Sequence, residues 1–391
     1  MRMKALILLT VLWIMLAAHA QEFDQLKLPK IPEKMKEMIA ANEIAGAVTC
    51  VVTRDKIVAL DAVGMADVEK NEPMKTDNLF WIASMTKPLT GASIVSLAEQ
   101  GKLSIDDPVE KYIPEFSRVK TPSGKPANLT IKQLLSHTSG LAEVSGKPAQ
   151  QCKDLAEMIP LFVDKPTQFE PGTQWKYCQS GINSLGRIIE IVSGMSYPDF
   201  VQRKFLEPLG MKDSTFYPTP EQLNRLAHSY KLDPDTHKLE SSAIGMLSGI
   251  DFSAHDHVAL PNAGLFSTAP DYARFMQMLL NGGSLDGKTY LKPESVKLLT
   301  SNLTADLKAG FVPAKHHWGC ATGVVEESAG VTEFLSPGTF GHGGAYGTQA
   351  WADPVKGVAY ILMVQRANFK NSDDSSVRKA FQEAAANAMV K

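Results

Sequence analysis

The chain has 391 residues, of which 44% are hydrophobic, with 40 Lys and Arg against 42 Asp and Glu for a formal net charge of −2. Because the basic residues are not clustered, this balance argues against nucleic acid as a partner. A single hydrophobic core stops growing at about 250–300 residues, so this length predicts two lobes. A cleft between lobes is a common place for a small-molecule site.

The first twenty residues have the pattern of a secretory signal peptide. Two basic residues precede an apolar run that ends in Ala18-His19-Ala20, and we expect cleavage between Ala20 and Gln21. The run is too short for a membrane-spanning helix, and no later stretch reaches about 18 uninterrupted apolar residues. We therefore expect an exported mature chain, 21–391, without a membrane span. The sequence does not distinguish the periplasm from the extracellular space.

The hydrophobic pattern changes along the mature chain. A short amphipathic helix is expected at 31–42, followed by two β-branched runs that predict a hairpin, at 47–52 and 57–60. A mostly helical middle has apolar residues at three- to four-residue spacing, at 131–136, 181–193 and 270–280. Strand signals then return before a polar helix from about 374, at 318–325, 347–352 and 358–364. This order predicts one antiparallel sheet built from both chain ends and flanked by helices.

The same pattern suggests where the two lobes divide. We expect a sheet lobe formed by about 44–83 together with about 311–391, and a mostly helical lobe at about 84–310. The helical lobe would then be an insertion packed against the sheet.

A serine and a lysine three residues apart form the most informative motif. Ser84 and Lys87 precede Pro88 and a segment that is apolar on most sides as far as about Leu97, which predicts a buried helix. Helix residues three apart have Cβ atoms about 5–6 Å apart, so the Lys87 amine can reach the Ser84 hydroxyl. A serine hydroxyl is a weak nucleophile until a neighbouring base activates it. This pair is therefore the candidate catalytic centre.

Two other Ser-x-x-Lys matches provide a contrast. Ser117 and Lys120 lie in a loop region rich in Pro and Gly, and Ser376 and Lys379 lie on the polar C-terminal helix. Neither pair opens a buried helix, so we interpret both as chance matches.

Two weaker motifs follow in the chain. Tyr177 and Gln179 immediately precede a helical pattern, and His342-Gly343-Gly344 is flanked by strand signals. Each motif alone would have a packing role. A pair of glycines, however, lets a strand approach a ligand closely.

The order of the three motifs resembles the class C β-lactamase and D-Ala-D-Ala carboxypeptidase family, which includes the family VIII carboxylesterases. Segments 131–141 and 263–272 are similar to the same family, so the resemblance covers nearly the whole mature chain. It implies an α/β fold of the α+β type, the β-lactamase/penicillin-binding-protein transpeptidase-like fold. It also implies a structural role for His137.

The resemblance also implies roles within the site. Ser84 would attack an acyl carbon while Lys87 and Tyr177 transfer its proton, and His342 would support Tyr177 or the leaving group. The oxyanion would be held by the backbone N–H groups of Ser84 and Ala345. No metal or organic cofactor is implied.

Two departures from the family pattern bear on the substrate. Gln179 replaces the usual asparagine that contacts a substrate amide, and Gly343, before Gly344, lacks the hydroxyl that helps hold a carboxylate. Both changes favour a carboxylesterase that acts on small acyl esters. The alternatives are a β-lactamase or a D-Ala-D-Ala carboxypeptidase and, from another class, a penicillin-binding cell-wall sensor without turnover. The expected partner is a small ester, amide or β-lactam, and the oligomeric state is not determined by the sequence.

Cysteines and histidines leave two further questions. Four cysteines, Cys50, Cys152, Cys178 and Cys320, are either buried thiols or disulfides with three possible full pairings. His255-Asp256-His257 and His316-His317 have poor spacing for metal ligands, and we expect no metal site.

Overall fold

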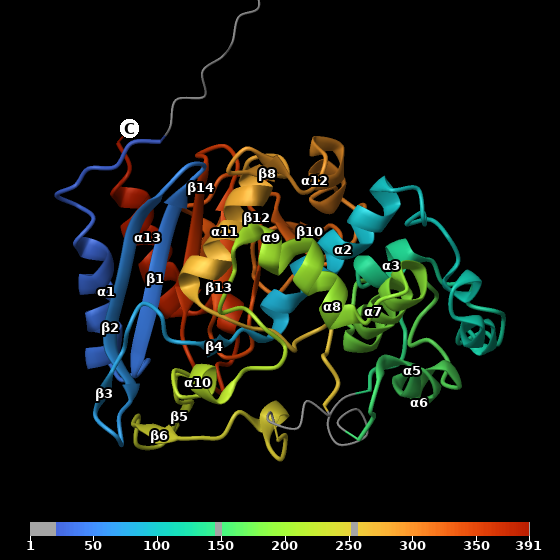
Figure 1. The fold of residues 1–391 in the computed structure, drawn as a ribbon, viewed down its shortest axis with the longest axis horizontal. Helices are drawn as coiled ribbons and strands as arrows, with labels where there is room; N and C mark the ends of the chain where they lie inside the picture. Colours follow the sequence, from blue (N-terminus) through green and yellow to red (C-terminus); the bar gives the residue numbers. More distant parts are fainter. Residues whose placement is uncertain (1–20, 145–150, 252–256, 391) are drawn as a thin grey trace, which may run out of the picture.

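The computed structural model describes residues 21–144, 151–251 and 257–390 (Figure 1). The predicted signal peptide, 1–20, lies outside the described residues. Within the described ranges, no helix has both the length and the apolar character needed to cross a membrane.

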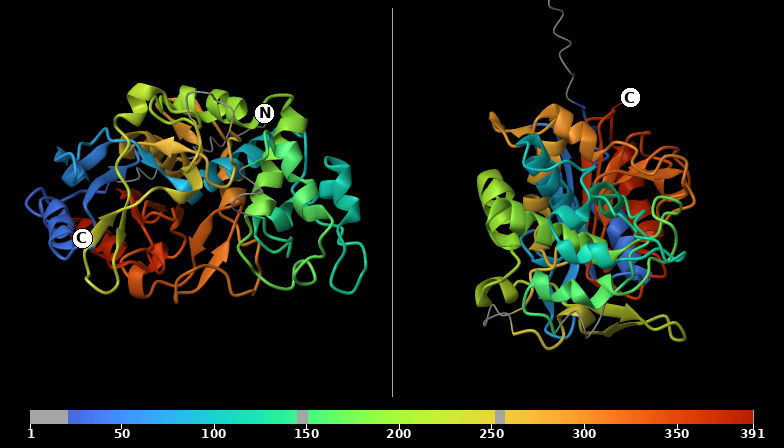
Figure 2. Two further views of the ribbon diagram at one scale, coloured as in Figure 1. Left: turned by 90° about the horizontal axis from the view of Figure 1, so that it is seen from below. Right: turned by 90° about the vertical axis from the view of Figure 1, so that its right-hand side faces the viewer.

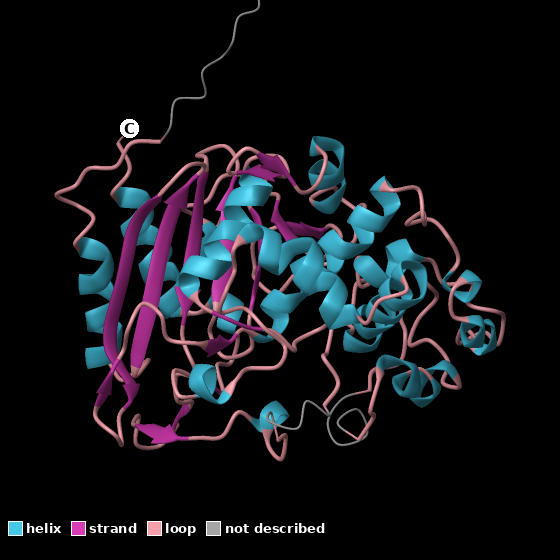
Figure 3. Cartoon of the chain, viewed as in Figure 1, coloured by secondary structure: helices cyan, strands magenta, loops and turns pink. Residues whose placement is uncertain are grey.

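An eight-stranded sheet joins the two ends of the described chain, as predicted (Figure 3). Its strands, given in spatial order, are β10 (His316–Trp318), β11 (Gly323–Val325), β12 (Phe340–Gly343), β13 (Gln349–Asp353), β14 (Val358–Met363), β1 (Gly46–Thr53), β2 (Ile57–Asp67) and β3 (Glu72–Pro73). Neighbouring strands are antiparallel. Strand β1 from the N-terminal part of the chain pairs with β14 from the C-terminal part, and Cys50 lies opposite Ile361.

The sheet is covered on both faces, which explains why β1 is buried along its whole length (Figures 1 and 2). Successive strand residues point to opposite faces. Val48 and Val52 belong to the core shared with α11 (Ala269–Leu280), whereas Ala47 and Val51 pack with α1 (Lys30–Ala40) and α13 (Ser376–Asn387). An apolar run without polar alternation is typical of such a doubly covered strand.

The α11-side core continues into the helical part of the molecule. Helix α2 (Lys87–Glu99) is buried along most of its length, and it packs against α7 (Gln179–Ser193) and α12 (Pro293–Leu299). The shorter α-helices are α3 (Ile131–Leu135), α5 (Leu155–Met158), α6 (Pro160–Val163), α8 (Tyr197–Val201), α9 (Glu207–Leu209) and α10 (Pro220–Leu223). Helical turns of other types are η1 (Ala83–Thr86), η2 (Val109–Lys111), η3 (Pro114–Arg118), η4 (Gln202–Leu206), η5 (Gly245–Leu247), η6 (Gly330–Thr332) and η7 (Ser372–Asp374).

Several very short strands were not predicted from the sequence. They are β5 (Tyr230–Leu232), β6 (Leu239–Ser241) and β15 (Arg366–Ala367) in one small sheet, the pair β4 (Phe80–Trp81) and β7 (Phe266–Ser267), and the pair β8 (Ser284–Leu285) and β9 (Lys288–Thr289). Strands of two or three residues have no periodicity to detect, and two of the four pairings, β5 with β15 and β4 with β7, join segments far apart in the chain.

The longer predicted elements are confirmed, with one difference at 318–325. That segment contains β10, a turn and β11, because Ala321 adopts a left-handed φ of 54° that reverses the chain. The two strands then pair with each other, with Trp318 opposite Gly323.

Candidate active site

Ser84 lies at the junction between a strand and a helix. Strand β4 pairs with β7, and η1 follows and carries Ser84 directly into α2, where Lys87 is the first residue. The predicted helix mouth is therefore a tight 3₁₀ turn. Ala83, immediately before the serine, has a φ of 47°, which is strained for a residue with a Cβ and persists only where surrounding contacts impose it. Ser84 is partly exposed, so its hydroxyl is accessible.

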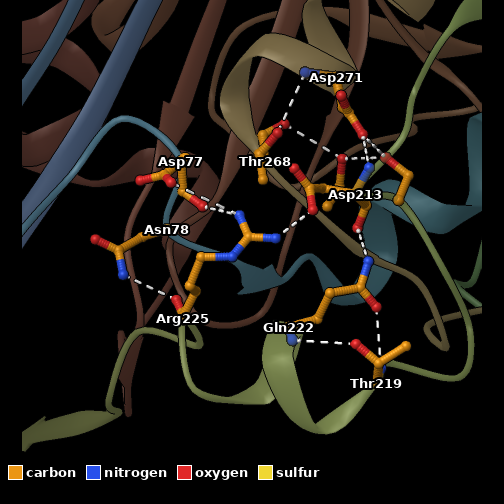
Figure 4. A network of polar contacts seen from close by, with 10 residues as sticks. Asp77, Asn78, Asp213, Thr219, Gln222, Arg225, Thr268 and Asp271 are labelled. Atoms are coloured by element: carbon orange, nitrogen blue, oxygen red, sulfur yellow. Dashed lines mark hydrogen bonds and ion pairs between the residues drawn. The ribbon is translucent and has the colours of Figure 1, made fainter.

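A polar network supports the strand that leads to Ser84 (Figure 4). The Arg225 guanidinium donates to the Asp77 carbonyl oxygen at 2.6 Å and pairs with Asp213, while the Asn78 amide donates to the Arg225 carbonyl at 2.8 Å. The Asp213 N–H in turn donates to the carboxylate of Asp271 on α11 at 2.8 Å. These bonds anchor the segment before β4 to the helix that covers the sheet.

The Lys87 side chain is fully buried between the serine and a backbone carbonyl. Its Nζ donates to the Asn262 carbonyl oxygen at 2.7 Å and is hydrogen-bonded to Ser84 Oγ at 3.0 Å. The Tyr177 ring centroid lies 4.7 Å from Lys87 Nζ. Burial lowers the pKa of Lys87 well below its usual value, and the Glu143 charge opposes this only in part. A lysine in this environment can act as a base.

Tyr177 connects this pair to the third motif. Its Oη lies 3.3 Å from Nε2 of His342, whose Nδ1 donates to the Gly343 carbonyl oxygen at 2.6 Å. With Nδ1 carrying the proton, Nε2 accepts from the phenol. Burial raises the pKa of Tyr177, partly offset by a hydrogen bond with Ser84, and burial together with the Lys87 charge lowers the pKa of His342 to about 3. At neutral pH the phenol is protonated and the imidazole is uncharged.

His137 is hydrogen-bonded to the two residues that flank Tyr177 in the chain. The Lys176 N–H donates to the His137 carbonyl oxygen at 3.0 Å, and the Cys178 N–H donates to His137 Nδ1 at 3.1 Å. The imidazole also lies against the Tyr177 ring, with centroids 4.5 Å apart. These packing and loop-bonding contacts agree with the structural role that the resemblance implies.

Gln179 has its side-chain oxygen directed at another protein group. Its Oε1 accepts from the Asn262 amide at 2.8 Å, and its backbone N–H donates to the Glu143 carboxylate at 2.8 Å. Sequence reasoning missed Asn262 and Glu143, because neither belongs to a recognisable motif. Asn262 contacts both Gln179 and Lys87, so it links the second motif to the first.

The two glycines of the third motif lie in close contacts. A Cβ at Gly343 would lie 2.0 Å from Asp373 Oδ1, and a Cβ at Gly344 would lie 2.6 Å from the Ile82 carbonyl oxygen. Gly343 offers no hydroxyl, as the sequence indicates, and Asp373 Oδ1 lies where a side chain at this position would project. The approach of Gly344 to Ile82 brings the exposed Ala345 close to the η1 turn.

The structure describes all four cysteines and part of the two histidine clusters. All four cysteines are buried thiols, and burial raises the pKa of Cys50, Cys178 and Cys320 to about 12. Among the described residues, no group of three or more His, Cys, Asp or Glu could hold a metal ion. His255 and Asp256 lie outside the described residues, and His316 donates from Nδ1 to the Ala314 carbonyl oxygen at 2.8 Å.

The family model described as "Beta-lactamase" matches residues 31–384, a range that includes all three motifs. The chain belongs to the β-lactamase family of serine hydrolases. It is 33% identical over 367 residues to Protein Rv1367c of Mycobacterium tuberculosis, covering 85% of this chain and 88% of that protein. It is 27% identical over 363 residues to esterase EstB of Burkholderia gladioli, with the same coverage of each chain.

Solved structures agree on the fold. A family VIII carboxylesterase superposes with a TM-score of 0.77 at 19% identity, covering 94% of this chain and 99% of that chain. The predicted β-lactamase/penicillin-binding-protein fold is thereby confirmed for this member of the family.

Proposed function

We propose that this protein is an exported carboxylesterase that hydrolyses small acyl esters through an acyl-enzyme on Ser84. The observation that carries the proposal is the position of Lys87, a fully buried amine with Nζ 3.0 Å from Ser84 Oγ. Burial favours the neutral amine, which can accept the serine proton as the hydroxyl attacks.

Acylation follows from the order of these contacts. Ser84 Oγ forms a bond to the acyl carbon while its proton passes to Lys87. As the bond to the alcohol breaks, Tyr177 donates its proton to the leaving oxygen and is reprotonated from Lys87, after which the phenol can again donate to His342 Nε2. Water then attacks the acyl carbon and gives a proton to Lys87. The bond between the acyl carbon and Ser84 Oγ breaks, the carboxylic acid leaves, and the proton passes to Ser84.

Backbone donors stabilise the charge that develops on the acyl oxygen. Ser84 is the second residue of η1, where a helical N–H has no acceptor within its own helix. The Ala345 N–H is the second proposed donor, held near η1 by the close approach of Gly344. The loss of one such donor typically costs about 2.7–4 kcal/mol of transition-state stabilisation.

Four observations favour an ester over a β-lactam or a peptide. Asp373 occupies the space beside Gly343 where a carboxylate-binding hydroxyl would project, and the Gln179 oxygen is bound by Asn262. One relative is named as an esterase, and one structural neighbour is titled as a family VIII carboxylesterase.

Export and lobe organisation complete the proposal. We infer that 1–20 is a cleaved signal peptide and that the mature chain, 21–391, acts in the periplasm or outside the cell. The site would lie where the sheet lobe (about 44–83 and 311–391) meets the helical lobe (about 84–310), because η1 packs against β12 there.

A substrate panel tests the proposal. For the mature protein, kcat/KM on p-nitrophenyl acetate or butyrate should exceed that on nitrocefin and on a D-Ala-D-Ala peptide. A higher value for nitrocefin or the peptide would refute the esterase assignment, and a stoichiometric burst without turnover would favour a penicillin-binding sensor.

The nucleophile can be tested independently of the substrate. A fluorophosphonate should label Ser84, and Ser84→Ala should abolish turnover with little change in melting temperature. Ser117 and Ser376 are matched comparisons. Ser117 donates to the Pro114 carbonyl oxygen at 2.7 Å, and Lys379, the partner of Ser376 in its motif, pairs with Glu333 at 2.9 Å. Peptide mapping of the adduct to either serine would contradict the assignment.

A further inference from the structure

The carboxylate of Asp373 takes the place of a side chain at the third motif. Gly343 and Gln349 face each other across β12 and β13. Both Asp373 Oδ1 and Gln349 Nε2 come within 2.5 Å of the position that a Gly343 Cβ would have. The Gln349 amide also donates to the Ser372 carbonyl oxygen at 3.1 Å, which fixes η7 against the end of the sheet.

A buried arginine lies beside this carboxylate. Arg378 is fully buried, and its Nη1 donates to the Asp373 backbone carbonyl oxygen at 2.7 Å while its Nε donates to Gln382 at 3.2 Å. Its guanidinium carbon lies 4.2 Å from the Trp351 ring centroid. Nη2 has no hydrogen-bond partner among the described residues. A guanidinium with an unpaired N–H is suited to bind a carboxylate.

The arginine and the aspartate line a small cavity beside the third motif. Its volume is about 20 Å³, and its lining includes His342, Gly343, Asp373 and Arg378. The charge of Asp373 contributes to the raised pKa of Tyr177, so its field reaches the catalytic phenol. Burial raises the pKa of Asp373, and the charge of Arg378 opposes this rise in part.

We propose that Asp373 is a specificity-determining residue that offsets the charge of Arg378 and thereby makes the enzyme select neutral esters over esters that bear a carboxylate. Without Asp373, the guanidinium would attract an anionic substrate group at the end of β12. With it, the pair has no net charge, and the carboxylate oxygens fill the space beside Gly343. This inference rests on the proposed esterase function and defines its substrate class.

Two esters with acyl chains of equal length test the inference: p-nitrophenyl butyrate and mono-p-nitrophenyl succinate. The wild-type enzyme should prefer the butyrate by kcat/KM. Asp373→Asn should reduce that preference by about tenfold, the size expected for one uncompensated charge a few ångströms from a substrate carboxylate. Assays at about pH 8 keep the carboxylate of the succinate ester ionised.

Asp374→Asn is the matched control, because Asp374 is the exposed neighbour on the same turn and its substitution makes the same charge change. It should change the preference less than Asp373→Asn does, because the charge of Asp373 acts on Arg378 more strongly than that of Asp374. Equal preferences in wild type and Asp373→Asn would overturn the inference, as would a wild-type enzyme that hydrolyses the succinate as fast as the butyrate. The wild-type comparison holds even if the variant does not fold.

The failure of the esterase proposal would look different. In that case neither ester would be turned over, and charge preference would be measured as the rate at which Ser84 is modified by a neutral phosphonate and by one that bears a carboxylate. A faster reaction with the neutral probe in wild type, reduced in Asp373→Asn, would still support the inference. Equal ratios in the two proteins would refute it.

Discussion

At the scale of single residues, the site consists of polar groups kept uncharged by burial. Lys87 and His342 have lowered pKa values and Tyr177 a raised one, and burial is the first cause in each case. The desolvation that prepares Lys87 to accept a proton also makes its charged form costly in the folded state.

This cost predicts a pH-dependent effect of Lys87→Met on stability. Because the folded-state pKa of Lys87 lies below the unfolded value, the unfolded chain binds more protons between these two pKa values. The contribution of Lys87 to the free energy of unfolding of the wild-type protein therefore falls as the pH falls from about 10.5 toward the folded-state pKa. The free energy of unfolding of the variant relative to wild type, measured by urea denaturation, should rise as the pH is lowered through that window.

Lys379→Met is the control for this effect. The Lys379 side chain is 42% exposed, and its ion pair with Glu333 raises its pKa, so the relative stability of this variant should not rise as the pH falls. If the relative stability of both variants changed with pH in the same way, burial of Lys87 would not be the cause of the pH dependence.

At the scale of elements, the position of the turn after β12 depends on a contact between backbones. Gly344 approaches the Ile82 carbonyl oxygen, and its N–H donates to the Thr348 carbonyl oxygen at 2.7 Å. The turn that carries Ala345 is thereby held against η1, which carries Ser84. The proposed oxyanion donors thus come from two elements whose spacing is set by a residue without a side chain.

Gly344→Ala should separate these two elements. The added Cβ would lie 2.1 Å from Thr348 Oγ1 and 2.6 Å from the Ile82 carbonyl oxygen, so the turn must shift. We expect a loss of about 1–3 kcal/mol in stability and a fall in kcat of about 10²-fold or more. The measurements are urea denaturation and steady-state kinetics on p-nitrophenyl butyrate.

Gly245→Ala is the comparison, because a Cβ at Gly245 would meet no atom within 4 Å. This variant should retain both stability and turnover. A Gly344→Ala enzyme with unchanged kcat would contradict the proposed place of Ala345 in the oxyanion site.

At the scale of the whole molecule, the two ends of the described chain complete one sheet and meet beside it. The Asp24 N–H donates to the Ala388 carbonyl oxygen at 2.8 Å, and the Val390 N–H donates to the Glu22 carbonyl oxygen at 2.9 Å. The central β1–β14 pair and the packing of α1 against α13 continue this contact.

A circular permutant should therefore fold. Joining residue 390 to residue 21 by a short linker, with new ends between Ser123 and Gly124, cuts only an exposed loop and leaves every sheet strand intact. We expect native-like circular dichroism and retained ester hydrolysis. Truncation before Ser376 is the contrast, since it removes Val377 and Phe381 from the core. An unfolded permutant would show that the order of the two ends along the chain matters to folding.

The sequence by itself determined the fold class, the longer helices and strands, and the residues that meet at the site. Periodicity over ten or more residues marks a helix or a covered strand, and the motifs of Ser84, Tyr177 and His342 are each contained in a few consecutive residues. The structure brings these three residues and Lys87 together. Their catalytic roles stay predictions.

Only the tertiary structure decided what surrounds those residues. Three contacts join positions far apart in the chain: Asn262 with Lys87, His137 with the Tyr177 segment, and Asp373 with Gly343. Such contacts leave no local pattern, because each depends on how separate elements pack rather than on neighbours in sequence. The same reason explains why the sequence left the state of the four cysteines open and why it could not place Asp373 beside Gly343.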